Sequence, residues 1–116
     1  MTKINGIAVI GDGGWGTTLA VLLAKKGLNV SLWSAFPEYA AVVKNSRENV
    51  KFLHGIKIPS KIDVTGSLEE ALDGRDLVVL AVPSQFMRGV LNKLKSQNIS
   101  GKRFVSVTKG IENGTL

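Results

Sequence analysis

Gly11-Asp12-Gly13-Gly14-Trp15-Gly16 is the stretch that decides the fold of this chain. It satisfies the pattern G-x-G-x-x-G and lies between an apolar run at 7–10 and a segment with helical signals. At such a junction the first glycine permits a tight turn, the second leaves room for a pyrophosphate against the backbone, and the third lets the helix approach the strand closely. The amides at the helix N-terminus face the negative charge. We therefore predict a dinucleotide-binding loop with Gly11, Gly13 and Gly16 in these three roles.

The rest of the chain alternates apolar runs with helical segments. Runs rich in β-branched residues at 7–10, 30–33, 77–82 and 104–108 predict strands, and a shorter run at 62–65 predicts a fifth. These runs are nearly continuous in apolar residues, which is typical of strands covered on both faces. Helices are predicted at 16–26, 37–47, 67–73 and 83–95. Ser67 and Glu70 fit a reciprocal capping box, and Ser84 fits an N-cap.

This β-α-β-α-β-α-β-α-β order predicts an α/β fold of the Rossmann class. Right-handed crossovers place helices on both sides of a doubly wound parallel sheet, which makes three layers with strand order 3-2-1-4-5. We interpret residues 1–116 as one dinucleotide-binding domain, since 116 residues are too few for two cores. The sequence stops soon after a strand, where another helix ordinarily follows, so we expect the domain to be the truncated start of a longer protein.

The composition excludes several other classes. Hydrophobic residues make up 44% of the chain and cysteine is absent, so it is neither a disordered chain nor a disulfide scaffold. The net charge of +6 favours anionic partners, phosphates included. No run nears the roughly 20 apolar residues that span a bilayer, and no secretory signal opens the sequence, so we expect a cytoplasmic protein. Stacking aromatics do not interleave with the basic residues and no metal-ligand spacing is present, so we expect no nucleic acid and no metal.

Asp12 and the residues after the second predicted strand affect how well the cofactor binds and whether it is NAD or NADP. A carboxylate directed at a pyrophosphate would repel it, so we expect Asp12 to point away. Rossmann domains that prefer NAD usually carry an acid after the second strand, whereas those that prefer NADP often supply an arginine. Here the stretch contains Ser34 and Ala35, so neither marker is present, although Lys44 or Arg47 is placed to approach from the following helix. The sequence leaves the preference between NAD and NADP open.

With Gly13-Gly14-Trp15-Gly16-Thr17 in view, the chain resembles the N-terminal domain of NAD(P)-dependent glycerol-3-phosphate dehydrogenases. Further segments with this resemblance are Val30-Ser31-Leu32-Trp33, Arg47-Glu48-Asn49 with Phe52-Leu53 and Gly55, Val82-Pro83-Ser84-Gln85, and Thr108-Lys109-Gly110-Ile111-Glu112. The five motifs stand in the family's order and cover essentially the whole chain. The resemblance implies an enzyme that interconverts dihydroxyacetone phosphate and sn-glycerol 3-phosphate for glycerophospholipid synthesis. It also implies a second, helical domain that supplies another catalytic lysine and most contacts to the substrate phosphate.

The resemblance implies roles for single residues as well. It carries Gly14 and Trp15 onto cofactor-contacting loop positions, Phe86 onto a position that touches the dinucleotide, and Lys109 onto a lysine shared by cofactor and substrate. Without it, Trp15 fits either a core ring or a ring at the cofactor's entry, and Phe86 fits the core. Lys109 follows the fifth strand at the carboxyl edge of the sheet, where an ammonium stabilises alkoxide character at C2 of the substrate. We therefore predict Lys109 as the catalytic and substrate-binding residue.

The predicted cofactor-binding residues are Gly11, Gly13, Gly14, Trp15, Gly16, Ser34, Ala35, Phe52, Pro83, Phe86 and Lys109. Four positions depart from the family's usual residues: Gly14 replaces Ser or Asn, Ala35 replaces Arg, Phe52 replaces Tyr and His54 replaces Pro. Two other interpretations stay open. The chain fits another two-domain dehydrogenase acting on a hydroxy acid or sugar acid, and it fits a non-catalytic module that senses NAD(H). A small-molecule substrate is expected, and a homodimer is one arrangement open to the full-length form.

Overall fold

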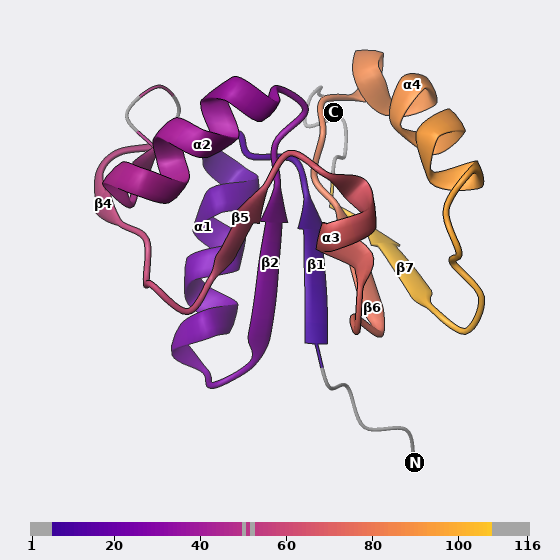
Figure 1. The fold of residues 1–116 in the computed structure, drawn as a ribbon, viewed down its shortest axis with the longest axis horizontal. Helices are drawn as coiled ribbons and strands as arrows, with labels where there is room; N and C mark the ends of the chain where they lie inside the picture. The colour runs from indigo at the N-terminus through magenta and orange to yellow at the C-terminus, as the bar shows by residue number, and fades with distance from the viewer. Residues whose placement is uncertain (1–5, 50, 52, 108–116) are drawn as a thin grey trace.

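A parallel sheet lies at the centre of the structure (Figure 1). The computed structural model describes residues 6–49, 51 and 53–107. The strands of the sheet are β1 (Gly6–Ile10), β2 (Asn29–Trp33), β5 (Asp63–Thr65), β6 (Leu77–Leu80) and β7 (Arg103–Ser106). They follow the order β5-β2-β1-β6-β7, and every pair of neighbours is parallel. This order confirms the predicted 3-2-1-4-5, in which strands are numbered by their place among the five predicted runs.

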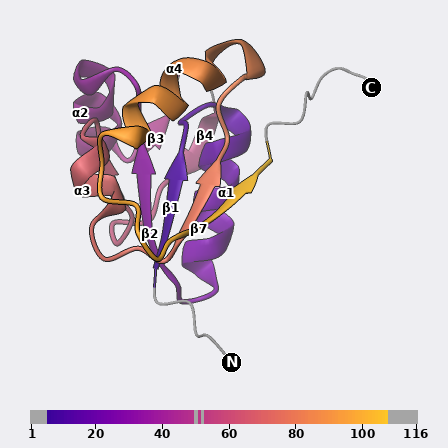
Figure 2. The same ribbon diagram turned by 90° about the vertical axis from the view of Figure 1, so that its right-hand side faces the viewer.

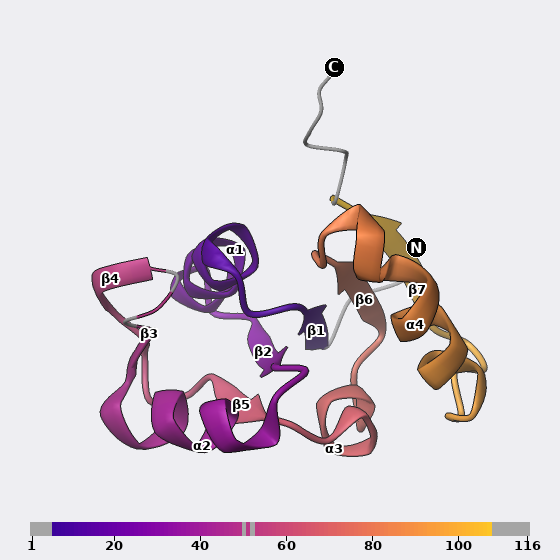
Figure 3. The same cartoon turned by 90° about the horizontal axis from the view of Figure 1, so that it is seen from above.

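The helices in the described part of the chain cover both faces of this sheet. They are α1 (Gly14–Lys25), α2 (Pro37–Ser46), α3 (Leu68–Leu72) and α4 (Ser84–Lys95). Successive side chains of β1 point to opposite faces, so the strand contributes to two cores. Ile7 and Val9 pack with residues of α1 and α2, whereas Ala8 and Ile10 pack with residues of α3 and α4. Figure 3 shows α1 and α3 on opposite sides of β1 and β2, so the three-layer α/β fold is confirmed.

The starts of α3 and α4 differ from the predicted caps. Ser67 accepts a hydrogen bond from the Glu70 amide at 3.2 Å, as predicted. The Glu70 carboxylate, however, accepts from the Thr65 hydroxyl at 2.6 Å, and that hydroxyl accepts from the Ser67 amide at 3.0 Å, so Thr65 stands between the two halves of the capping box. The prediction that Ser84 is an N-cap is wrong, because α4 begins at Ser84 and Pro83 occupies the cap position.

A short antiparallel pair, β3 (Glu48–Asn49) and β4 (Leu53–Lys57), adds to the predicted elements. It forms a separate two-stranded sheet between α2 and β5. Arg47 ends α2 with a φ of 58°, and this left-handed residue turns the chain into β3. The pair is short and largely polar, so it has neither a long apolar run nor a clear two-residue period by which sequence could reveal it.

β7 is one of the two edge strands of the sheet and lies beside β6 (Figure 2). All five residues of β1 are buried, as expected for a strand covered on both faces. In β7, by contrast, Phe104 is 39% exposed and Val105 is 46% exposed, so the expected cover is not found for this strand within the described residues. The glycine loop follows β1, so it starts from the best-covered strand at the centre of the sheet.

Candidate dinucleotide-binding site

The protein's own packing requires two of the three glycines of the loop. Gly11 has a φ of +125°, a conformation that residues with a side chain rarely adopt. A Cβ at this position would also lie 2.7 Å from the Ala81 carbonyl oxygen. A Cβ at Gly16 would overlap the carbonyl oxygen of Gly11. The roles predicted for these glycines, a tight turn and a close helix approach, agree with this geometry.

Gly13 is different, because nothing in the described structure requires a glycine there. Its φ of −64° and ψ of 179° suit any residue. A Cβ at this position would meet no atom within 4 Å, so the missing side chain leaves open space beside the loop. Gly13 is also the N-cap of α1 and provides no side-chain cap, so the amides of the first turn face this space. The bare backbone and the helix N-terminus together fit a pyrophosphate.

A cavity of about 170 Å³ adjoins the loop. It lies at the carboxyl edge of the sheet, where β1, β2 and β6 end, which is the edge at which open α/β sheets bind ligands. Its lining is largely apolar and consists of Gly11, Asp12, Gly13, Trp33, Ala35, Phe36, Ala81, Val82, Pro83 and Phe86. The structure therefore brings together five predicted cofactor residues, which are Gly11, Gly13, Ala35, Pro83 and Phe86.

The aromatic residues at this edge are partly exposed. Trp15 is 55% exposed and Phe86 is 59% exposed, so neither is a core ring. For Trp15 this favours the interpretation of a ring at the cofactor's entry, and for Phe86 it overturns the core assignment that the sequence pattern alone favoured. Phe36, to which sequence reasoning assigned no role, is 67% exposed and lines the same cavity.

The residues after β2 and in α2 include polar side chains, but the structure leaves few of them available to bind a cofactor. Ser34 is fully buried, and its hydroxyl accepts from the Phe36 amide at 3.2 Å and donates to the Phe36 carbonyl at 3.3 Å. Arg47 does not approach this edge, because its guanidinium donates to the carbonyls of Pro59 and Ile62 at 3.1 and 2.8 Å. Lys44 lies in the last turn of α2, at the end of the helix remote from Ser34. The expectation that Lys44 or Arg47 approaches the cofactor is therefore wrong.

Asp12 lines the cavity next to Ala35 and Phe36, at the end of β2. Burial raises the pKa of Asp12 above its ordinary value, although interactions with Ser34 and with its own backbone, together with the charge of Lys51, act in the opposite direction. One carboxyl oxygen, Oδ2, is buried and has no hydrogen-bond partner among the described residues. The glycine loop thus contains an incompletely satisfied acceptor at the end of β2.

Asn49 connects β3 to the glycine loop. Its side-chain amide donates to the Asp12 carbonyl at 2.6 Å and to the Thr17 hydroxyl at 2.8 Å, and its oxygen accepts from the Tyr39 hydroxyl. The Thr17 hydroxyl in turn donates to the Asp12 carbonyl at 3.0 Å. Asn49 is fully buried, so these bonds form away from water. Sequence reasoning quoted Asn49 within a motif but gave it no role, because the contact spans 37 residues.

We expect Asn49→Ala to lower the stability of the chain by about 2 kcal/mol and to weaken dinucleotide binding. The loss leaves the Asp12 carbonyl with one donor fewer and the Tyr39 hydroxyl without this acceptor, and buried groups left unpaired are costly. Urea denaturation and calorimetric titration with NADH measure the two effects. Asn45→Ala is the matched control, since Asn45 is exposed on α2 and its change should stay within about 0.5 kcal/mol. Equal stability of the two variants would contradict the role of Asn49.

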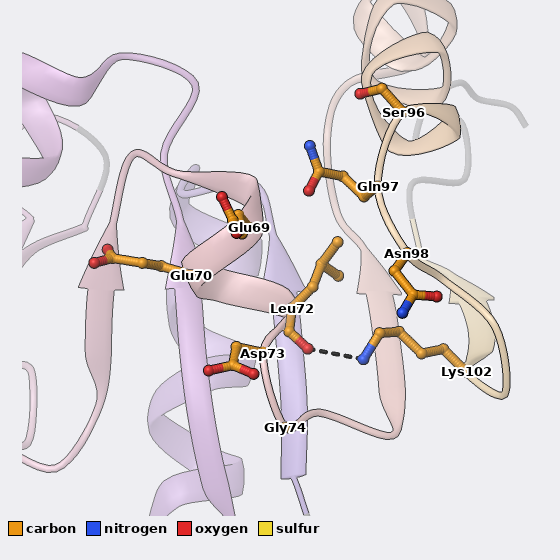
Figure 4. A pocket seen from close by; sticks show the side chains of 9 residues that line it. All are labelled: Glu69, Glu70, Leu72, Asp73, Gly74, Ser96, Gln97, Asn98 and Lys102. Carbon is orange, nitrogen blue, oxygen red and sulfur yellow. Dashed lines mark hydrogen bonds between the residues drawn. The ribbon is translucent and has the colours of Figure 1, made fainter.

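A larger hollow of about 810 Å³ lies away from the glycine loop, between α3 and the segment that joins α4 to β7 (Figure 4). Acidic and amide side chains line it. Its lysine, Lys102, donates to the carbonyls of Leu72 and Arg75 at 2.8 and 2.6 Å, so the ammonium satisfies backbone oxygens at the end of α3. We assign no ligand to this hollow.

Phe52 and Lys109, both predicted site residues, lie outside the described residues. Within residues 6–49, 51 and 53–107, no group of three or more His, Cys, Asp or Glu side chains is placed to hold a metal. The same part of the chain contains no helix with the length and apolar character needed to cross a membrane.

A glycine loop between the central strand of a parallel sheet and the first helix, with an open cradle at Gly13, defines a dinucleotide-binding domain of the Rossmann class. Residues 6–116 match the family described as NAD-dependent glycerol-3-phosphate dehydrogenase N-terminus. The chain belongs to this family.

Known proteins similar to the chain support this assignment. A glycerol-3-phosphate dehydrogenase [NAD(P)+] from Geobacter metallireducens is 50% identical over 110 residues, which are 95% of this chain and 33% of the relative. One of the same name from Chlorobium phaeobacteroides is 47% identical over 106 residues, 91% of this chain and 32% of the relative. The crystal structure of glycerol-3-phosphate dehydrogenase from Coxiella burnetii superposes with a TM-score of 0.83 at 28% identity, covering 88% of this chain and 31% of that one. The chain therefore spans about a third of the length of the curated relatives it matches.

Proposed function

We propose that the chain is the cofactor-binding part of an oxidoreductase that transfers hydride between NAD(P)H and dihydroxyacetone phosphate to give sn-glycerol 3-phosphate. The open cradle at Gly13, in a chain of this family, is the observation that carries the proposal. The relatives bear the name of a dehydrogenase that uses NAD(P)+ and glycerol 3-phosphate. The product would feed glycerophospholipid synthesis, and we place the protein in the cytoplasm.

In this proposal the glycine loop and the cavity beside it bind different parts of the cofactor. The backbone from Gly11 to Gly16 and the N-terminus of α1 hold the pyrophosphate. Ala35, Pro83 and Phe86 form apolar walls, and Trp15 shapes the entry. In our proposal Gly14 and Phe52 complete the predicted contacts, whereas the predicted contact at Ser34 is not made, because its side chain is fully buried and bonds the Phe36 backbone. The bound cofactor supplies or accepts the hydride, while the protein orients it and excludes water.

Lys109 is proposed to act on the substrate. Its ammonium attracts the phosphate of cofactor or substrate and donates a hydrogen bond to the C2 oxygen of dihydroxyacetone phosphate. When hydride reaches C2, the carbonyl π bond breaks, the oxygen gains negative charge, and a proton completes the alcohol. We assign the delivery of that proton to a second, helical domain beyond residues 1–116, which would also hold the substrate phosphate. A homodimer of the complete protein belongs to the same proposal.

The test uses two forms of the protein. By calorimetry, the 116-residue chain should bind NADH weakly and, by absorbance, should not oxidise it with dihydroxyacetone phosphate. The complete protein encoded by the reading frame that contains the chain should oxidise NADH or NADPH with dihydroxyacetone phosphate. Activity with non-phosphorylated keto acids alone would favour another dehydrogenase. Binding that changes assembly without any turnover would favour a sensor. Turnover by the 116 residues alone would refute the need for a second domain.

A further inference from the structure

The end of β2 lacks the groups that usually distinguish the two nicotinamide cofactors. The cofactors differ at the 2′ position of the adenosine ribose, where NAD has a hydroxyl and NADP has a phosphate. Rossmann domains ordinarily place an acid or an arginine directly after the second strand to read this difference. Here Ala35 has no polar side chain, and the hydroxyl of the buried Ser34 bonds the backbone of Phe36. If the site distinguishes NAD from NADP, a residue other than Ser34 or Ala35 must do so.

Asp12 brings a carboxyl group to this position from the glycine loop. The Asp12 carboxyl interacts with Ser34, the residue that follows β2, so the acid lies at the end of β2 although it belongs to a different segment. The Asp12 backbone is fixed there, because its carbonyl accepts from both Thr17 and Asn49, at 3.0 and 2.6 Å. Asp12 also lines the cavity beside Ala35 and Phe36.

The Asp12 carboxyl has unused hydrogen-bonding capacity. Its Oδ2 is buried and has no partner among the described residues. A buried carboxylate oxygen without a donor is unfavourable, so a ligand hydroxyl that donates to it would be stabilised. A ribose hydroxyl is such a donor, whereas a phosphate at the same position would bring negative charge against the carboxylate.

The charged residues around Asp12 do not reverse the expected preference for a ribose hydroxyl over a phosphate. Lys51 is the cation that acts on Asp12, and its ammonium also lies 5.4 Å from the centre of the Tyr39 ring. Glu38, in the first turn of α2, lines a hollow together with Lys51 and Phe36. Two carboxylates therefore stand near one lysine, and Arg47 is held at the far end of α2.

We propose that Asp12 supplies, from the glycine loop, the carboxylate that selects the 2′-hydroxyl of NAD(H) over the 2′-phosphate of NADP(H). This inference rests on the proposed dinucleotide binding. It makes Asp12 a specificity-determining residue, and it gives the protein a preference that the second strand does not encode.

The test is the ratio of dissociation constants for NADPH and NADH, measured by calorimetric titration of the 116-residue chain and of the complete protein. We expect NADH to bind at least about tenfold more tightly than NADPH. Asp12→Asn should reduce this ratio about fivefold or more, mainly by tightening NADPH. Adenosine 2′,5′-bisphosphate and AMP, which differ only in the 2′ phosphate, should show the same change.

The controls separate this inference from the proposed function. Asp73→Asn removes the same charge at the end of α3, in the hollow remote from the glycine loop, and should leave the ratio unchanged. Asp12→Ser provides a second variant, and thermal unfolding checks that each variant is folded. If NADPH binds as tightly as NADH, or if both Asp12 variants keep the wild-type ratio, this inference is overturned while dinucleotide binding stands. If neither dinucleotide binds to the folded protein, the proposed function fails and the inference fails with it.

Discussion

Gly16→Ala is expected to unfold the chain at temperatures where the wild type is stable. A Cβ at this position would overlap the carbonyl oxygen of Gly11 and lie 3.3 Å from the Ala81 side chain. The first of these neighbours is backbone and cannot rotate away, so α1 would have to move off the sheet. Overpacking of this kind against backbone costs about 3 kcal/mol or more, a large part of the stability of a small domain. Circular dichroism during thermal and urea unfolding measures the loss.

Gly13→Ala is the matched variant, with the opposite outcome. The backbone at Gly13 accommodates alanine, and the new methyl group would meet no atom within 4 Å, so the melting temperature should change little. The methyl group would instead fill the space left for the pyrophosphate, and we expect NADH affinity to fall about tenfold or more. A Gly13→Ala protein that binds NADH like the wild type would show that the pyrophosphate lies elsewhere. A stable Gly16→Ala protein would show that the close approach of α1 is not needed.

Lys109→Met in the complete protein is expected to lower kcat for dihydroxyacetone phosphate about 100- to 1,000-fold. The proposed reason is the loss of the ammonium that stabilises charge on the C2 oxygen as hydride arrives, and removal of one such donor has effects of about this size. NADH affinity should fall far less, because the loop at 11–16 still holds the pyrophosphate. Steady-state kinetics and calorimetry measure the two quantities separately.

Lys95→Met is the control for Lys109, since Lys95 is exposed in the last turn of α4 and its loss changes the net charge equally. A Lys109→Met enzyme with kcat within about threefold of the wild type would remove Lys109 from the mechanism. In that case a sensing module, which has no use for a lysine at the substrate edge, would become the better interpretation.

Much of the fold follows from local signals. Apolar runs marked all five strands of the main sheet, and right-handed crossovers fixed their order. The glycine loop was predictable because its spacing and its place after a strand depend on neighbouring residues only. The Ser67 cap was predictable for the same reason. Each of these features is determined by residues that are only a few positions apart in the sequence.

The rest of the site depends on contacts between distant segments. Asn49 reaches Asp12 across 37 residues, and nothing in its neighbourhood indicates that contact. Arg47 was expected to approach the cofactor, but its guanidinium donates to the carbonyls of Pro59 and Ile62. The Glu70 carboxylate was expected to accept directly from the Ser67 amide, but the Thr65 hydroxyl lies between these two groups and bonds both. In each case side-chain hydrogen bonds formed by the assembled fold decide the outcome.

The two tryptophans of the chain differ in their exposure to solvent, so their emission spectra should differ. Trp15 is largely in solvent at the mouth of the cradle, so its emission should be red-shifted and should be quenched when a nicotinamide cofactor arrives. Trp33 is 2% exposed, and its indole nitrogen donates to the Gly66 carbonyl at 3.1 Å, so its emission should be blue-shifted until the protein denatures. Because Trp33 also lines the cavity beside the glycine loop, a bound cofactor should quench both rings, whereas only loss of the native core should shift the emission of Trp33 to the red.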